Sequence, residues 1–255
     1  MRSCCSARFR HRAISLLVVY CSTLAGAGEE PAQDAFRAGA LALKARDYEA
    51  AIASFELAAT LRPQHAGTWL ELGIARSALS DWDGALEAYG RVIEIEPTNA
   101  KAFHNMGNVR FRRGDFTEAA VDYAKALELA PGYGRAAFHL GWALRQLGRS
   151  EEAEGVFRRC VELPATDPAS MRVRVDCTFG LGSVRHRAGD YAASAALMEQ
   201  VLAVHPGHPE ARYYLAISYR QLGRLEDAAR ELEVHREILA ARRQSPREFE
   251  GPDAP

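Results

Sequence analysis

Histidine is the residue type in this chain whose spacing could support metal chemistry. His205 and His208 stand three positions apart and could offer two ring nitrogens to one ion. A second group has one histidine in each of three successive stretches of the chain: His104, His139 and His186. We expect neither group to bind a metal, because Pro206 places the first pair in a turn and the other three belong to different helices.

Motifs for catalysis are absent from the sequence. The chain has no H-E-x-x-H, no glycine-rich loop of the kind that cradles phosphate, and no G-x-S-x-G turn around a nucleophilic serine. We therefore expect no catalytic site, no cofactor and no enzymatic activity.

The first 27 residues have the pattern of a secretory signal peptide. Arg2, Arg8, Arg10 and Arg12 precede an apolar stretch over 13–25, and the small residues Ala25-Gly26-Ala27 follow it. The apolar stretch is shorter than the roughly 20 residues of a membrane span. We expect cleavage after Ala27 and an exported protein, periplasmic or secreted. The alternative is that the segment remains uncleaved and anchors the chain in a membrane.

Composition and charge describe a folded, helical chain. Hydrophobic residues make up 48% of the 255 positions, aromatic residues 9%, and 46 residues are alanine, the strongest helix former. The net charge is −1, but four of the 32 basic residues and none of the 33 acidic ones lie in the signal segment. The remaining chain thus has a net charge of −5, which does not favour a nucleic-acid partner.

A period of 34 residues runs through most of the chain. Four columns show it, one each of glycine, alanine, aromatic residues and proline. Their members are Gly39, Gly73, Gly107 and Gly141; Ala51, Ala85, Ala119 and Ala153; Phe55, Tyr89, Tyr123 and Phe157; Pro63, Pro97 and Pro131. A fixed period of this length predicts a stack of identical helical units.

The columns resemble the tetratricopeptide repeat (TPR) family. Its pattern of W-x2-L-G, A-x3-F and a final proline is matched in one copy by Trp69, Leu72, Gly73, Ala85, Tyr89 and Pro97. The resemblance implies an all-α fold, a right-handed α-solenoid of about six helix-turn-helix units. We place the units at 32–65, 66–99, 100–133, 134–167, 175–208 and 209–243, the last with a capping helix, followed by a disordered tail over 244–255.

Local signals place the ends of the helices. Turn glycines are expected to take left-handed backbone conformations at Gly114, Gly148, Gly189 and Gly223. Asp81, Asp115 and Asp190 are expected to cap second helices. Residues 168–174 are an insertion, because Gly141 and Gly182 are seven residues further apart than the period. The sequence leaves open whether this surplus forms a longer loop or extends the next helix.

The two cysteines outside the signal segment are Cys160 and Cys177. They fall on elements that should pack together, and export would expose both thiols to oxidation. One interpretation is a disulfide across the irregular segment. The other is two buried small hydrophobic side chains.

The resemblance also implies an inner surface lined by the first helix of each unit. The residues expected to bind a partner there are Lys101, His104, Asn105, Asn108, Arg112, Arg135, Phe138, His139, Trp142, Arg145, Phe179 and Arg187. Their basic and aromatic character favours a protein or extended peptide that is acidic and has an apolar anchor. The alternative is that the arginines form a solvated face and the rings belong to the core.

These expectations favour an exported scaffold or adaptor that binds a protein or peptide in a groove. The alternative is an accessory subunit that positions an envelope biogenesis enzyme or a secretion complex. The carboxylate clamp known in this family is matched only by Asn108, so we do not expect that clamp. A membrane contact is expected only if the N-terminal segment stays uncleaved, and the sequence does not fix the oligomeric state.

Overall fold

The structure is a computed structural model that describes residues 29–244, and all regular structure within that range is α-helical. The expected signal peptide and nearly all of the expected tail lie outside the described residues. A first helix occupies 29–44. The helices that follow are α2 (Tyr48–Leu61), α3 (Ala66–Ala78), α4 (Trp82–Ile95), α5 (Ala100–Arg113), α6 (Phe116–Leu129), α7 (Gly134–Gln146), α8 (Ser150–Glu162), α9 (Pro168–Arg187), α10 (Tyr191–Val204), α11 (Pro209–Gln221) and α12 (Leu225–Gln244).

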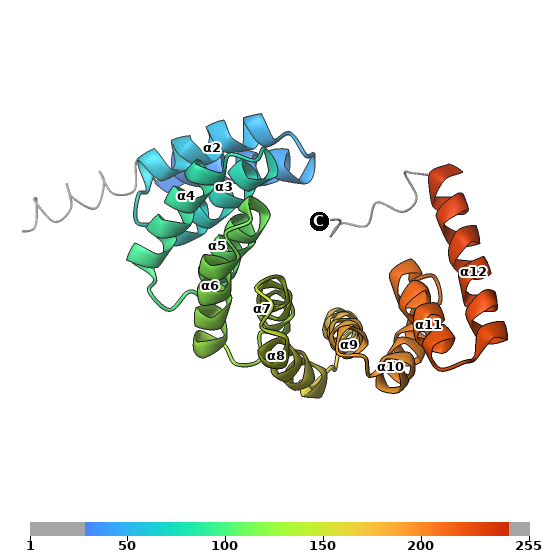
Figure 1. The fold of residues 1–255 in the computed structure, drawn as a ribbon. Coiled ribbons are helices and arrows are strands. Elements are labelled where there is room, and N and C mark those ends of the chain that lie inside the picture. Colours follow the sequence, from blue (N-terminus) through green and yellow to red (C-terminus); the bar gives the residue numbers. More distant parts are fainter. Residues whose placement is uncertain (1–28, 245–255) are drawn as a thin grey trace, which may run out of the picture. The chain divides into compact units, whose positions relative to one another are not determined.

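Successive helices pair as helix-turn-helix units, which confirms the all-α repeat fold. The chain divides within α5 into two compact units: the first unit ends at Val109, and the second unit begins at Arg110. In the second unit α7, α9 and α11 lie along one side, while α8, α10 and α12 lie along the other (Figure 1). The first helices also contact one another, because α9 packs against both α7 and α11.

Glycines on the first helices make room for the aromatic column of the second helices. A methyl group added to Gly39 would lie 2.7 Å from the ring of Phe55, and one added to Gly73 would lie 2.4 Å from Tyr89. Both rings are almost completely buried. At these positions of the glycine column, any side chain would collide with a ring of the paired helix.

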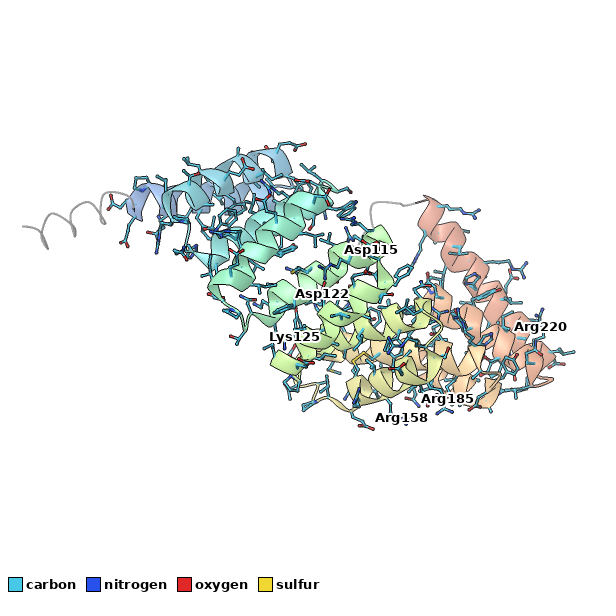
Figure 2. The ribbon with its side chains drawn as sticks, turned by 60° about the vertical axis from the view of Figure 1, so that its left-hand side comes forward. Asp115, Asp122, Lys125, Arg158, Arg185 and Arg220 are labelled. Carbon is cyan, nitrogen blue, oxygen red and sulfur yellow. A yellow bond between two sulfur atoms is a disulfide. The ribbon has the colours of Figure 1, made fainter. Side chains whose placement is uncertain are left out.

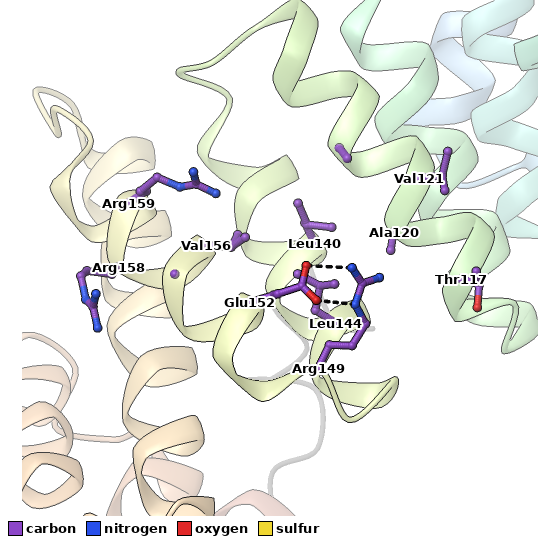
Figure 3. A pocket seen from close by; sticks show the side chains of 12 residues that line it. Thr117, Ala120, Val121, Leu140, Leu144, Arg149, Glu152, Val156, Arg158 and Arg159 are labelled. Atoms are coloured by element: carbon purple, nitrogen blue, oxygen red, sulfur yellow. Dashed lines mark hydrogen bonds and ion pairs between the residues drawn. The ribbon is translucent and has the colours of Figure 1, made fainter.

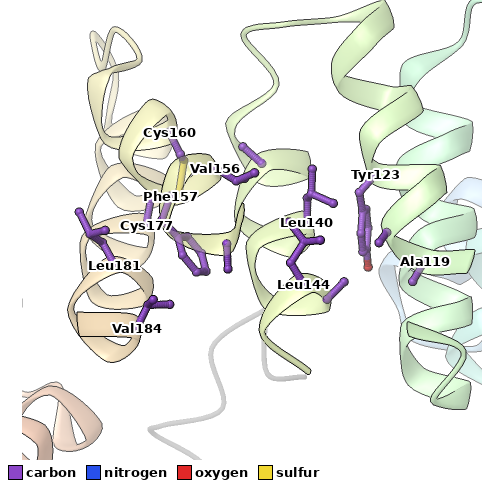
Figure 4. Packing of buried hydrophobic residues seen from close by; sticks show 14 residues of the cluster. Ala119, Tyr123, Leu140, Leu144, Val156, Phe157, Cys160, Cys177, Leu181 and Val184 are labelled. Carbon is purple, nitrogen blue, oxygen red and sulfur yellow. A yellow bond between two sulfur atoms is a disulfide. The ribbon is translucent and has the colours of Figure 1, made fainter. Parts of the chain in front are cut away.

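Phe157 occupies the same position in the second unit and touches two glycines at once. Added methyl groups on Gly141 of α7 and Gly180 of α9 would lie 2.5 Å and 2.4 Å from its ring. The surrounding cluster joins α6, α7, α8 and α9 into one core (Figure 4). Phe157 thus fixes the spacing between three consecutive helices.

The turns within the units are left-handed, as expected. Gly114, Gly148, Gly189 and Gly223 all have positive φ angles between 74° and 89°. The first two helix-turn-helix repeats have Arg46 and Ser80 at the equivalent turn, each with φ of 60°. This conformation is costly for residues that carry a Cβ atom, so these two turns are strained relative to the other four.

The expected caps are confirmed at two of three positions. Asp81 and Asp190 accept hydrogen bonds from the amides of Gly84 and Ala193, each at 3.1 Å. The expectation is wrong for Asp115, which precedes α6 but makes no capping bond with its side chain. Its carboxylate instead lies 3.1 Å from Nε of Arg113, which competes for the same oxygen atoms.

The insertion over 168–174 is helical. Helix α9 begins at Pro168 and has 20 residues, whereas α7 and α11 have 13 each. Asp167 accepts from the amides of Ala169 and Ser170, and Ser170 Oγ accepts from the amide of Asp167. This capping box and the proline in the first turn start the helix early, so the surplus residues extend α9 at its N-terminal end.

A disulfide joins Cys160 on α8 to Cys177 on α9. Both residues are buried in the core around Phe157 (Figure 4). The bond therefore attaches α9 to the preceding helix-turn-helix repeat, at a point on α9 just after its additional residues 168–174.

One ion pair is buried in the second unit. Asp122 on α6 is 5% exposed and accepts a hydrogen bond from Nη1 of Arg110 at 2.7 Å. Figure 2 shows Asp122 on this helix, between Asp115 and Lys125. Burial raises the pKa of Asp122 to about 6, although Arg110 acts in the opposite direction.

Candidate functional site

Neither histidine grouping forms a metal centre within the described part of the chain. No three histidine, cysteine or acidic side chains between residues 29 and 244 are arranged to hold an ion. His208 instead accepts from the amide of Ala211 at the start of α11, and His205 lies in the turn before it. Over the same range, no helix combines the length and the apolar character needed to cross a membrane.

Three aromatic side chains from three different first helices come together in the second unit. Phe179 on α9 lies between Trp142 on α7, at 6.1 Å between ring centroids, and Tyr214 on α11, at 5.8 Å. All three rings are half-buried, and each packs against a buried core cluster on one side. We call Trp142, Phe179 and Tyr214, together with Arg145, the aromatic site.

Arg145 lies over this group of rings. Its guanidinium stacks on Trp142, with Cζ 4.5 Å from the ring centroid, and its Nη2 donates to the hydroxyl of Tyr214 at 3.2 Å. The contact joins α7 to α11, and one complete helix-turn-helix repeat, α9 and α10, lies between their repeats in the sequence. A cation held by a ring and a neutral hydroxyl keeps its charge available for a partner.

His186 and His208 border the aromatic site. His186 contacts Tyr214 at 5.0 Å and forms a hydrogen bond with Ser218 Oγ at 3.1 Å, while His208 contacts Phe179 at 4.7 Å. Burial lowers the pKa of His186. A lowered pKa keeps this ring neutral at pH 7, so Arg145 is the cation of the aromatic site.

Only part of the expected binding set belongs to this cluster. Trp142, Arg145 and Phe179 lie in it, and Phe138 is adjacent, with its ring 6.1 Å from Trp142. His139 instead contacts Tyr123, on the side of α7 toward α6. The other cations of the expected set in the second unit are all exposed: Arg112, Arg135 and Arg187.

The expected binding residues on α5 before position 110 belong to the first unit. Lys101 is exposed and lies near Glu71. Burial raises the pKa of Glu71, and the positive charge of Lys101 offsets part of this increase. His104 is buried, with Nδ1 3.3 Å from Oδ1 of Asn105, and Asn108 is half-buried. The structure therefore places an acidic neighbour beside Lys101 and turns His104 away from solvent.

Sequence reasoning missed Tyr214, which completes the aromatic site. Tyr214 lies on α11, the first helix of the sixth helix-turn-helix repeat, one repeat beyond Phe179 on α9. Extending the inward-facing positions to the sixth unit would have identified this helix as part of the surface. The hydrogen bond from Arg145, 69 positions earlier, has no signal in the sequence.

A hollow lies on the outer side of the second unit, between α6, α7 and α8. It has a volume of about 670 Å³ and an apolar floor that includes Leu140, Leu144 and Val156 (Figure 3). Arg149 and Glu152 close one end as an ion pair. Arg158, which also lines the hollow, forms an ion pair with Glu154.

Comparisons with known proteins agree with this repeat architecture. Models of the tetratricopeptide repeat match residues 35–65, 76–112, 98–164 and 179–246, which together span well over half of the chain. No curated protein matches the chain.

Solved structures share the fold at low sequence identity. YrrB, described as "a TPR protein with an unusual peptide-binding site", is 23% identical over 72% of this chain and 91% of its own, with a TM-score of 0.59. MamA is 21% identical over 68% and 97%, with a TM-score of 0.60. PilF of Pseudomonas aeruginosa is 16% identical over 87% and 95%, with a TM-score of 0.68. The chain belongs to the tetratricopeptide repeat family, whose members are generally non-catalytic scaffolds for protein–protein interaction.

Proposed function

We propose that this protein is an exported scaffold that binds an extended segment of a partner protein across α7, α9 and α11. The observation that carries the proposal is the aromatic site: three half-buried rings and a stacked guanidinium supplied by three consecutive first helices. A surface built from three units suits a segment several residues long. The peptide-binding site named in the description of YrrB supports the same use of the fold.

The chemistry of the aromatic site favours a segment that carries an apolar side chain. One side of each ring packs on the core, which holds the rings in place before a partner arrives. Rigid rings bind with little loss of conformational freedom, and aromatic residues often dominate binding energy at interfaces. Phe179 is at the centre of the group and is the residue on which we expect binding to depend most.

Export rests on a separate set of observations. The first 27 residues have the charge and apolar pattern of a signal peptide. The Cys160–Cys177 disulfide supports export because such bonds persist in oxidising compartments and are rare in the cytosol. A fusion of residues 1–40 to a reporter that is active only outside the cytoplasm should be active, and an inactive fusion would exclude this route.

The binding proposal is tested by affinity capture with the full chain. Wild-type protein should retain partners from an extract of the exported fraction, and the Trp142→Ala/Phe179→Ala variant should lose them. Lys125→Gln is the matched control, because Lys125 is exposed on α6, away from the aromatic site. Circular dichroism should show all three proteins equally helical. Equal recovery by wild type and the double variant would show that the aromatic site is not the binding surface.

A further inference from the structure

Two hydrogen-bond donors in the aromatic site have no acceptor. Trp142 Nε1 and Arg145 Nε are both buried, and neither is hydrogen-bonded to any atom of residues 29–244. Nearly all buried donors in folded proteins have a partner, so an unpaired donor is a feature that calls for an explanation. Here two such donors belong to side chains that stack directly on one another.

Arg145 also has no carboxylate partner among the described residues. Within residues 29–244, no acidic oxygen lies within ion-pair distance of its guanidinium, and Tyr214 supplies its only hydrogen bond. Four comparable half-buried arginines each bond to a carboxylate: Arg76, Arg110, Arg185 and Arg212. These four guanidinium groups therefore have a carboxylate partner within the described residues, whereas Arg145 in the aromatic site does not.

We propose that Arg145 and Trp142 form a subsite for the carboxylate of an aspartate or glutamate in the bound segment. This inference rests on the proposed function, since it identifies the kind of segment that the aromatic site selects. A guanidinium can bind both oxygens of a carboxylate through two parallel hydrogen bonds. Phe179 lies beside Trp142 and would hold an apolar side chain that neighbours the acidic one in the segment.

The unpaired donors indicate how the subsite opens. In the free protein the guanidinium covers Trp142, and both unpaired nitrogen atoms are shielded. When Arg145 turns toward a carboxylate, its Nε gains an acceptor and the indole N–H of Trp142 is uncovered for a second contact. Binding of an acidic segment therefore changes the surroundings of Trp142, whereas binding of a neutral segment leaves the stack in place.

The test uses a displayed library of random eight-residue peptides and the full chain as bait. Wild-type protein should recover peptides enriched in an acidic residue next to an aromatic or aliphatic one. Replacing the acidic residue of a recovered peptide with its amide should weaken binding about tenfold or more, because the charged hydrogen bond is lost. The effect should shrink as salt rises, since the subsite is partly open to solvent.

Variants at Arg145 separate a role in recognition from a role in folding. Arg145→Gln should recover peptides without an acidic preference, and Arg145→Glu should recover peptides enriched in lysine and arginine. A reversed preference cannot result from a loss of structure. Lys125→Glu introduces the same change of charge on the outer helix α6 and should keep the acidic preference of the wild type.

Each outcome bears on one of the two proposals. If wild type recovers peptides without an acidic preference, or Arg145→Gln keeps that preference, the carboxylate subsite is excluded while the binding surface stands. If wild type recovers no peptides above background, the proposed function fails, and the subsite fails with it.

Discussion

Asp122 should make the protein more stable in mild acid than at neutral pH. Its buried carboxylate has a pKa of about 6 in the folded protein, compared with 3.8 for an ordinary aspartate. Between these values the folded protein holds a proton that the unfolded chain releases. The stabilisation is therefore complete below pH 4 and is lost as the pH rises through 6.

The size of the effect follows from the two pKa values. Each pKa unit corresponds to about 1.4 kcal/mol, and only part of the shift is realised at an accessible pH. Between pH 7.5 and pH 4.5, protonation of Asp122 should raise the free energy of unfolding by about 2 kcal/mol. Asp122→Asn removes this titration, so the stability of wild type relative to the variant should rise by that amount over the same interval.

Urea denaturation at both pH values measures this difference. Glu128→Gln removes an exposed carboxylate from the same helix and should not reproduce the difference. The reasoning would be refuted if wild type became more stable relative to Asp122→Asn as the pH rises. That result would mean that the ion pair with Arg110 outweighs the desolvation of the carboxylate.

Three further changes test the repeat architecture, each by denaturation and circular dichroism. Ser80→Gly should stabilise the protein by about 0.5–1 kcal/mol, because glycine relieves the positive φ angle at this turn; unchanged or lower stability would contradict the strain. The Cys160→Ala/Cys177→Ala variant should lose about 3 kcal/mol, since the bond closes a loop with a sequence separation of 17, and reductant should destabilise wild type but not this variant. Gly141→Ala should cost about 1–3 kcal/mol, because the new methyl group would lie 2.5 Å from a buried ring; a neutral effect would show that the helices are free to separate.

The repeat architecture was predictable because its signals are local and recur at a fixed interval. Gly73 predicts a close helix contact through its place in a column, and the structure supplies the ring of Tyr89 as the contact. The course of residues 168–174 was not decided by the repeat, since the family pattern contains no such segment. Asp167, Pro168 and Ser170 were nevertheless a readable helix start, because the capping box depends only on neighbouring residues.

The aromatic site was only partly predictable, because it depends on contacts between units. Trp142, Arg145 and Phe179 could be selected from their places in the repeat. The contact between Arg145 and Tyr214 joins residues two helix-turn-helix repeats apart, and its geometry depends on how tightly the helices stack. His104 shows the same dependence in the other direction, since neighbouring packing buries a residue that was expected to face the partner on the inner surface.

The most direct test of the central claim is to observe Trp142 while a peptide binds. The chain has three tryptophans, and the other two, Trp69 and Trp82, lie in the first unit. Titration with a recovered acidic–aromatic peptide should shift the indole N–H resonance of Trp142 in a proton–nitrogen NMR spectrum and leave the other two in place. A peptide that binds without moving the Trp142 resonance would contradict the assignment of the aromatic site as the binding surface.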